Sequence, residues 1–521
     1  MDHALRRDPA AKPRPLTRGR WWLLALGAVA AGILWGGCFA KAPHPWLGCL
    51  ALAPLFYFLD QERPGWLAFW HGMGFWAFSL WWIRATIETY GQLDPVSAVL
   101  GVLFVAAFQS LYSLGFGLIG VRLWRRWGAP ALLGLPALWV ALEWLKGQGA
   151  GGFPWNLAAY AWTDMPGALP LAAWIGAWGI SFLVVFANVG FAMAIRGRRL
   201  WPAVIGVLVP AILLAVGGRW ARGPEAVHEV GGLPVRVIQP NLPILVEWNP
   251  AAVQANYQTL LRLSRAACDE PGALLLWPES AAWPYSLQRD AELRSDVEGL
   301  LSQGCPVLLN SEFDLALPPV AGKSRDPEIY NSAFLVGKSG IEQAPRQDKR
   351  HLVPFGEYVP WRRTLTFLNK LARNAGEFTA GDHVTLLPVG NERLGLSLCY
   401  EVVFPSEVAE TVRAGATVLA TVTNDGWYGD TSAPWQHFRA AQFRAAENRR
   451  PLLRAALTGV SGIIGADGRV LAELGPGEQG VLRARVEGRS ELSPFTRFPS
   501  LVPLVTAALA AGALAFVMLR R

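Results

Sequence analysis

The sequence predicts a multi-span α-helical membrane domain, an extracytoplasmic α/β domain and one closing membrane helix. Two observations lead to this fold class. The 521-residue chain is 52% hydrophobic and only 17% charged, with a mean hydropathy of +0.26, whereas charged residues make up about a quarter of an ordinary soluble protein. The residue types also divide unevenly, because residues 1–220 contain 19 of the 25 Trp but only 25 of the 86 charged residues.

Eight apolar runs are candidates to cross a bilayer, which takes about 20 residues of helix. The second run is short and contains Pro54. The pattern predicts a membrane domain of about seven helices over residues 1–220, an α/β domain over 221–498, and a final span with a short tail over 499–521. The runs are residues 21–39, 45–59, 65–83, 96–121, 130–145, 168–195, 201–218 and 499–519. No cleavable signal peptide is expected before the first span.

The positions of Lys and Arg predict the orientation of these spans. The N-terminal tail and every second connection are basic, and the chain ends with Arg520 and Arg521. Basic short loops stay in the cytoplasm, so we expect both termini there and residues 221–498 on the other side. In a bacterium this describes a multi-pass inner-membrane protein with a periplasmic α/β domain. The net charge of +8 then reflects orientation, and no nucleic-acid partner is expected.

Residues 221–498 alternate short β-branched runs with helical stretches. Such alternation predicts layered sheets covered by helices. Two helices are expected, over Val253–Ala267 and Pro434–Asn448. The expected strands are Pro234–Ile238, Ala273–Trp277, Pro306–Asn310, Ser332–Val336, Leu394–Leu398 and Thr417–Thr423.

Three residues of catalytic type lie beside apolar segments in this domain. Glu279 comes after Pro278 at the end of one strand, Lys349 opens a Pro-bounded loop, and Cys399 ends another strand. Taken alone, each has a common structural explanation: an exposed loop acid, a solvated lysine and a small buried cysteine. Together they suggest a nucleophile, because a thiolate near neutral pH needs a neighbouring base or cation.

Other motifs are less decisive. The turn Thr423–Gly429 would either line a pocket or serve as an ordinary turn. The seven His show no metal-ligand spacing, and no phosphate-binding loop follows a strand, so we expect neither a metal nor a cofactor. The sequence leaves open whether Cys268 and Cys305 pair. Glu143 and Lys146, near the end of the fifth run, would pair, face a polar cavity, or simply pack or snorkel.

The motifs resemble the nitrilase superfamily, on Glu279 in Trp-Pro-Glu, Lys349 before Val-Pro-Phe-Gly-Glu, and Cys399 in Leu-Cys-Tyr-Glu. The whole chain is similar to the membrane-embedded apolipoprotein N-acyltransferase branch, through Gly152–Trp155 and Asn424–Asp430. This resemblance implies an αββα sandwich for the α/β domain. The chain departs from the family at residues 455–459, where relatives tend to have a polar turn.

The resemblance implies an enzyme that moves an acyl chain from a phospholipid, through a thioester on Cys399, to the α-amino group of the N-terminal diacylglyceryl-cysteine of an apolipoprotein. Glu279 would act as general base, and Lys349 with a backbone N–H would stabilise the oxyanion. We expect a monomer. Support of the catalytic residues is expected from Glu357, Tyr400 and Glu401, and substrate binding from Phe153, Trp155, Trp427 and Tyr428.

Other functions stay open at this point. A membrane-bound nitrilase-type amidohydrolase would use the same triad with water as acceptor, and an N-acyltransferase could act on another amine. A transporter with an accessory outer domain would explain the spans and leave the triad idle. Seven spans exceed what a tether requires, and the spans lack the several buried charges of an ion-coupled transporter.

Overall fold

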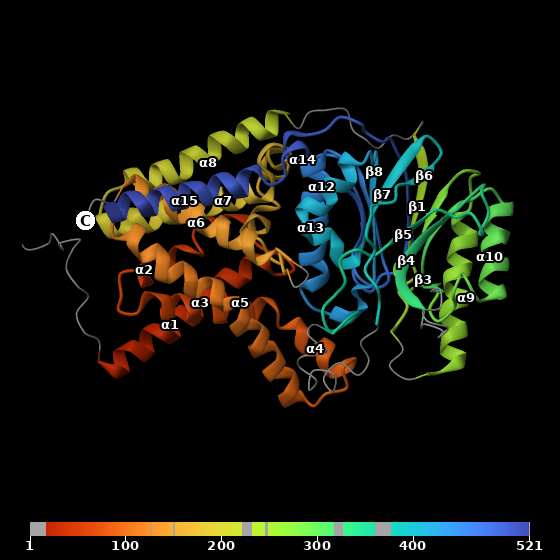
Figure 1. The fold of residues 1–521 in the computed structure, drawn as a ribbon, viewed down its shortest axis with the longest axis horizontal. Helices are drawn as coiled ribbons and strands as arrows, with labels where there is room; N and C mark the ends of the chain where they lie inside the picture. Colours follow the sequence, from red (N-terminus) through yellow and green to blue (C-terminus); the bar gives the residue numbers. More distant parts are fainter. Residues whose placement is uncertain are drawn as a thin grey trace, which may run out of the picture.

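In the computed structural model, a helical region and an α/β region lie beside each other along the long axis of the molecule (Figure 1). The structure describes residues 17–126, 128–149, 152–220, 232–244, 248–316, 327–359 and 377–519. The basic N-terminal tail up to residue 16 and the C-terminal Arg520 and Arg521, which carry part of the orientation prediction, lie outside these residues.

The helical region contains α1–α8 and the last helix, α15. Local sequence explains several starts: at α5, Asp94 accepts hydrogen bonds from the N–H groups of Val96 and Ser97, and Pro95 occupies the first position, which suits a residue without an N–H. The bounds are α1 Arg18–Gly36, α2 Ala53–Phe58, α3 Pro64–Ser79, α4 Trp82–Thr89, α5 Pro95–Trp124, α6 Ala129–Lys146, α7 Ala168–Gly197, α8 Trp201–Trp220 and α15 Leu501–Leu519.

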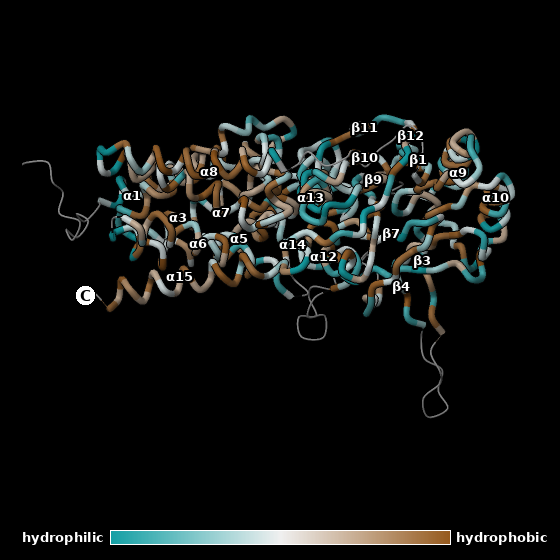
Figure 2. The backbone as a smooth tube through the Cα atoms, turned by 90° about the horizontal axis from the view of Figure 1, so that it is seen from above, coloured by the Kyte–Doolittle hydropathy of each residue, from teal (hydrophilic) through white to brown (hydrophobic). Residues whose placement is uncertain are grey.

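Five helices of the described residues are long and apolar enough to cross a membrane: Arg18–Phe39, α5, α7, α8 and α15. Figure 2 shows the hydrophobic character of α15 and its neighbours against the mixed character of the α/β region. The predicted spans 65–83 and 130–145 correspond to α3 and α6. The predicted span 45–59 is instead two pieces, a 3-10 helix over Pro45–Cys49 and α2, because Pro54 starts a new helix.

Helix α7 is interrupted at Gly176, and this break joins the two regions. Gly176 has a φ of 65°, and a Cβ there would lie 2.5 Å from the ring of Phe495, so glycine is required. The N–H of Ala177 starts the second half of the helix and donates to Glu447 Oε1 of the α/β region at 2.7 Å. A carboxylate at a helix N-terminus is a favourable contact, so the α/β region is anchored on α7.

The α/β region contains two six-stranded sheets packed face to face between helix layers, which confirms the predicted αββα sandwich (Figure 1). The strand orders are β12-β1-β2-β3-β4-β5 and β11-β10-β9-β8-β7-β6, with β1–β3 and β7–β9 parallel. The bounds are β1 Leu233–Gln239, β2 Leu274–Leu276, β3 Val307–Leu315, β4 Glu328–Val336, β5 Arg346–Asp348, β6 Leu387–Val389, β7 Glu392–Leu398, β8 Val418–Thr423, β9 Leu452–Ala456, β10 Ser461–Ile464, β11 Val470–Leu474 and β12 Gly480–Val486.

The helix layers differ in what they face. Helices α9 (Pro250–Ala267) and α10 (Ala291–Ser302) cover the outer side of the first sheet, and α12 (Pro405–Arg413) and α13 (Ala433–Asn448) lie between the second sheet and the helical region (Figure 1). The apolar core between the sheets includes Val237 and Leu398. A second core runs from α13 into the helical region, so the second sheet is held directly against the membrane-type helices.

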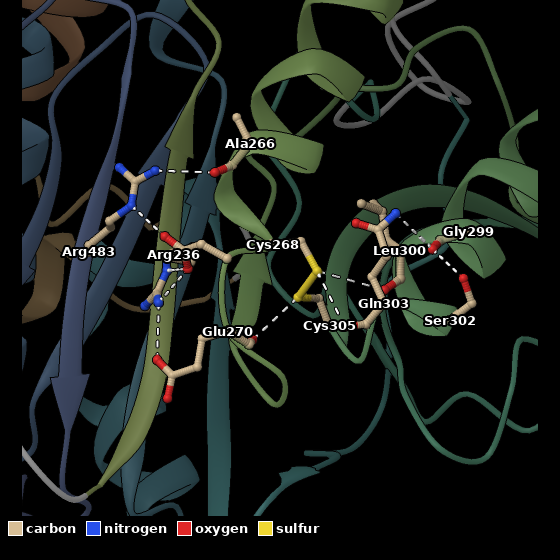
Figure 3. Close-up of a disulfide and its surroundings, with 11 residues drawn as sticks. Arg236, Ala266, Cys268, Glu270, Gly299, Leu300, Ser302, Gln303, Cys305 and Arg483 are labelled. Atoms are coloured by element: carbon tan, nitrogen blue, oxygen red, sulfur yellow. Dashed lines mark hydrogen bonds and ion pairs between the residues drawn. A yellow bond between two sulfur atoms is a disulfide. The ribbon is translucent and has the colours of Figure 1, made fainter.

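A disulfide joins Cys268 and Cys305 in the outer layer (Figure 3). Cys268 ends α9, and Cys305 lies between α10 and β3. Beside it, Arg236 of β1 pairs with Asp269 at 2.7 Å. The disulfide and this ion pair attach the outer helices to the first sheet.

Candidate active site

The three predicted catalytic residues lie together, each just beyond a strand. Glu279 follows β2, Lys349 follows β5 and Cys399 follows β7. The backbone N–H of Asn424, after β8, donates to Glu279 Oε2 at 3.1 Å, so the segments that follow β2 and β8 meet across the two sheets. Cys399 has a φ of 52°, in the left-handed region that costs a side-chain-bearing residue energy and that clusters at functional sites.

Lys349 lies between two carboxylates. Its Nζ donates to Glu279 Oε1 at 3.2 Å and to Glu357 Oε1 at 2.8 Å. Asn331 of β4 donates from one amide nitrogen to both carboxylates, at 3.1 Å to Glu279 and 2.8 Å to Glu357. The N–H of Val353 donates to the second oxygen of Glu357 at 2.8 Å. The predicted supporting residue Glu357 is therefore placed to orient Lys349.

The two carboxylates also set the charge of Lys349, which is only 1% exposed. Burial alone lowers the pKa of a lysine, but the charges of Glu279 and Glu357 outweigh burial and raise the pKa of Lys349 well above its usual value. Lys349 is therefore a protonated ammonium at neutral pH. It offers a fixed positive charge in a water-poor site, where such a charge acts strongly on a developing oxyanion.

Cys399 is buried, and its thiol is protonated at rest. Burial raises the pKa of the Cys399 thiol, the Glu279 carboxylate raises it further, and Lys349 opposes both. A thiol of this kind needs a base to take its proton when it attacks. Glu279 is the carboxylate whose charge acts most strongly on it.

Thr423, the last residue of β8, orients this thiol. Its Oγ1 lies 3.1 Å from Cys399 Sγ and 2.9 Å from Asp425 Oδ1, yet a hydroxyl has only one proton to donate. Burial alone raises the pKa of Asp425, but Arg454 and the hydrogen bonds of His437 and Thr423 lower it to about 2. The single Thr423 proton is therefore shared between the Cys399 sulfur and the ionised Asp425 carboxylate, and its hydrogen bond to the sulfur lowers the pKa of the thiol.

Asp425 belongs to a buried network that also reaches the Cys399 backbone. Arg454 Nη2 donates to Asp425 Oδ2 at 2.7 Å, and His437 Nε2 lies 3.1 Å from the Cys399 carbonyl oxygen. Burial and then the charge of Arg454 lower the pKa of His437. Nδ1 lies 3.1 Å from both Asp425 Oδ1 and Arg454 Nη2, so the ring links this charged pair to the nucleophile turn.

Glu401 holds the loops of Lys349 and Cys399 together. Its Oε1 accepts from the N–H groups of Arg350 at 2.6 Å and His351 at 3.1 Å, and its Oε2 accepts from Leu398 N–H at 2.6 Å. The sequence left open a structural ion pair for this residue. Its described partners are three backbone N–H groups, so Glu401 is a positioning residue for the nucleophile turn.

Tyr400 connects the nucleophile to the helical region. Its hydroxyl donates to the Gly152 carbonyl at 2.9 Å, and its ring stacks on Phe153 at 6.3 Å and Trp155 at 6.5 Å between centroids. Trp155 donates through Nε1 to Gln436 of α13 at 2.7 Å. Phe153 and Trp155, predicted to bind substrate, thus form a packed aromatic layer directly under the catalytic turn.

The last two predicted substrate residues lie against α4. Tyr428 is buried, with its ring 4.7 Å from that of Trp82, whereas Trp427 is 40% exposed and packs on Tyr90 at 4.6 Å. The Trp427 carbonyl accepts from Thr86 Oγ1 at 2.7 Å. Of the four aromatic residues, Trp427 is the one that offers a large apolar surface to a substrate.

Sequence reasoning missed several of these partners. Asn331 lies just before the expected strand Ser332–Val336 and carries no motif, and Arg454 and His437 join Asp425 only through the fold. The turn Thr423–Gly429 gave the one available signal for Thr423 and Asp425. No cluster of three or more His, Cys, Asp or Glu in the described part of the chain is arranged to hold a metal ion.

Comparison with known proteins decides the family. The profile of the apolipoprotein N-acyltransferase N-terminal domain matches residues 31–190, and that of carbon-nitrogen hydrolase matches residues 235–491. A relative from Geobacter metallireducens, named apolipoprotein N-acyltransferase, is 34% identical and aligns over 94% of this chain and 95% of its own length. The chain belongs to the apolipoprotein N-acyltransferase family.

Membership in the apolipoprotein N-acyltransferase family confirms the resemblance carried by the sequence motifs, and the chain is an enzyme with a membrane-type helical region. A relative of the same name from Brucella suis is 34% identical over 82% of this chain and 80% of its own. Among solved structures, a mutant of the Nesterenkonia AN1 amidase from the nitrilase superfamily aligns with 52% of this chain and 95% of its own, at 20% identity and a TM-score of 0.37.

Proposed function

We propose that this enzyme transfers an acyl chain from a membrane phospholipid to the α-amino group of the N-terminal diacylglyceryl-cysteine of an apolipoprotein. The observation that carries the proposal is the buried ammonium of Lys349, held between Glu279 and Glu357 beside the thiol of Cys399. This arrangement supplies a nucleophile, a base and a fixed positive charge in one buried site.

In the first half of the reaction, Glu279 takes the thiol proton as Cys399 Sγ attacks the ester carbonyl carbon of the phospholipid. Lys349 and a backbone N–H beyond Cys399 stabilise the oxyanion. When the intermediate collapses, the carbon–oxygen bond to the glycerol breaks, and Glu279 returns the proton to the departing alkoxide. The products are a thioester on Cys399 and a lysophospholipid.

In the second half, the neutral α-amino group of the apolipoprotein attacks the thioester carbonyl, and Glu279 takes the proton that the nitrogen loses. The carbon–sulfur bond breaks, an amide forms, and the proton passes to Sγ to restore the thiol. Water must be kept from the thioester for transfer to win over hydrolysis. The packed layer of Phe153, Trp155 and Tyr400 closes one side of the turn, and the exposed ring of Trp427 contacts the lipid chains.

For the topology, we propose a membrane domain over residues 1–220, a periplasmic catalytic domain over 221–498 and a final span with a cytoplasmic tail over 499–521, acting as a monomer in a bacterial inner membrane. The disulfide between Cys268 and Cys305 supports this orientation, because disulfides persist in the oxidising periplasm and are rare in the cytosol. Five long apolar helices fit the spans.

The test is acyl transfer by the purified full-length enzyme from a phospholipid with a labelled acyl chain to a peptide bearing N-terminal diacylglyceryl-cysteine. We expect the peptide amine to gain one acyl mass with ping-pong kinetics. Cys399→Ala should abolish transfer, and Cys38→Ala, which removes another buried free cysteine, should retain it. Label recovered only as free fatty acid at saturating peptide would assign the site to an amidohydrolase-type reaction and contradict the proposal.

A further inference from the structure

A cavity with a mostly apolar wall and several polar side chains lies inside the helical region, apart from the triad. It is enclosed by α1, α3, α5, α6 and the loop after α6, and none of Glu279, Lys349 and Cys399 lines it. The centres of water-sized spheres can occupy about 50 Å³ of it, which is room for several water molecules or a small polar group. Its polar lining includes His71, Gln109, Glu143, Lys146 and Asn156.

These lining side chains are all more than nine-tenths buried, yet several of their polar atoms are unpartnered. Among the described residues, nothing hydrogen-bonds to Gln109 Oε1, Glu143 Oε2, Asn156 Oδ1 and Nδ2, or His71 Nε2. A buried polar atom without a partner costs free energy comparable to a lost hydrogen bond. Four residues that share this deficit around one cavity indicate that the cavity receives a ligand.

The charged side chains of the lining indicate which charged groups the ligand has. Lys146 Nζ donates to the Trp155 carbonyl at 3.2 Å and lies 4.4 Å from the Trp76 ring, and no ion pair joins it to Glu143 among the described residues. The cavity therefore presents one ammonium and one free carboxylate oxygen. Both residues line the cavity, and Lys146 also packs against the Trp76 ring.

The unpartnered acceptors match a primary ammonium. Glu143 Oε2, Gln109 Oε1 and Asn156 Oδ1 provide three acceptor oxygens, and a primary ammonium has three N–H donors. Lys146 and Asn156 Nδ2 face the same space and suit an anionic phosphate. Tyr112 of α5 and Leu142 of α6, which also line the cavity, are partly exposed.

We propose that this cavity binds the headgroup of a zwitterionic phospholipid that carries a primary ammonium, at a position separate from the acyl-transfer site. The bound headgroup would join α3, α5 and α6 to the loop that bears Phe153 and Trp155, since Asn156 and the Lys146 contact to Trp155 belong to that loop. Lipid bound there would stabilise the aromatic layer under the nucleophile turn. The inference does not depend on acyl transfer.

The experiment uses the full-length chain with Cys399→Ala, so that no acyl chain can be transferred, freed of lipid in detergent. Native mass spectrometry would titrate it with phosphatidylethanolamine and phosphatidylcholine of identical acyl chains. We expect the ethanolamine lipid to bind at least about tenfold more tightly, because trimethylation removes hydrogen bonds made by a charged group.

Variants then assign that preference to the cavity. Gln109→Leu should abolish it, and so should Asn156→Gly, which keeps the left-handed backbone of that residue (φ 49°). Gln148→Leu, which removes an exposed amide outside the cavity, should retain it. Equal binding of the two lipids by the parent chain, or a preference that persists in folded Gln109→Leu and Asn156→Gly, would overturn the proposal and leave water as the only occupant.

Discussion

Two lysines are buried in this molecule in opposite ways. Lys349 in the α/β region is 1% exposed and donates to two carboxylates, whereas Lys146 in the helical region is 7% exposed and contacts a carbonyl oxygen and an indole ring. Around Lys349, each carboxylate accepts several hydrogen bonds without any substrate. Around Lys146, acceptors remain open. The first cluster is organised in advance for chemistry, and the second is suited to receive a ligand.

The largest difference is expected when each lysine is replaced by methionine. Lys349→Met leaves two buried carboxylates without a cation and should lower the unfolding free energy by about 3–5 kcal/mol. It should also reduce acyl-enzyme formation by about 10²–10³-fold through loss of the oxyanion partner. Lys146→Met loses one hydrogen bond and one cation–π contact, about 1–2 kcal/mol. Denaturation of both variants in one detergent measures this, and equal losses would contradict the comparison.

A second difference should appear in the reactivity of Cys399. Since Glu279 raises the pKa of this thiol and Lys349 lowers it, Glu279→Gln should lower the pKa and Lys349→Met should raise it. Below the pKa, the thiolate fraction changes about tenfold for each unit of pKa. Alkylation at pH 9, followed by peptide mapping at Cys399, should therefore be faster than wild type in Glu279→Gln and slower in Lys349→Met. Shifts in the same direction would argue against these charge assignments.

The two regions should also respond differently to loss of a buried carboxylate. Both oxygens of Glu401 accept hydrogen bonds from backbone N–H groups. Glu401→Gln would place a side-chain N–H group opposite one of these backbone N–H groups and should lower the unfolding free energy by about 1–3 kcal/mol. Glu143 uses only Oε1, which accepts from Ala158 N–H at 2.7 Å. In lipid-free protein, Glu143→Gln should therefore change thermal stability little. A larger loss of thermal stability in Glu143→Gln than in Glu401→Gln would contradict the hydrogen bonds assigned to these two carboxylates.

The smallest effect concerns the orientation of the thiol. Thr423→Val removes the hydroxyl between Cys399 and Asp425 and should slow acylation about tenfold, the value of roughly one hydrogen bond. Thr423→Ser keeps the hydroxyl and should restore most of the rate. Single-turnover acylation with a labelled phospholipid measures both variants. Equal rates for valine and serine would exclude a role for this hydrogen bond.

The sequence predicted the parts of the fold that rest on local pattern. All six expected strands correspond to β1–β4, β7 and β8, and the two expected helices correspond to α9 and α13. Six strands among the described residues were not predicted: β5 and β6, which have three residues each, the buried β9 and β10, and the partly exposed β11 and β12. Pro54 and the short length of the second apolar run were noted in the sequence, but the division of this run into two helices was not predicted.

The site divides in the same way. Glu279, Lys349 and Cys399 belong to local sequence motifs and could be predicted, and the structure brings them together. The positions of Asn331 and of the network of Asp425, His437 and Arg454 depend on strand pairing and on the packing of α13. Their spacing in the sequence therefore does not predict these contacts. Phe153 and Trp155 were expected to bind substrate, and the fold adds a packing function that only tertiary contacts with Tyr400 define.

The most direct test of the account is the mass of the intact protein after incubation with phospholipid in the absence of an acceptor. The account predicts that the wild-type chain and Cys38→Ala gain one acyl mass that hydroxylamine removes, and that Cys399→Ala gains none. A wild-type chain that binds labelled lipid and stays unmodified, or an adduct that persists in Cys399→Ala, would contradict the assignment of Cys399 as the residue that carries the acyl chain.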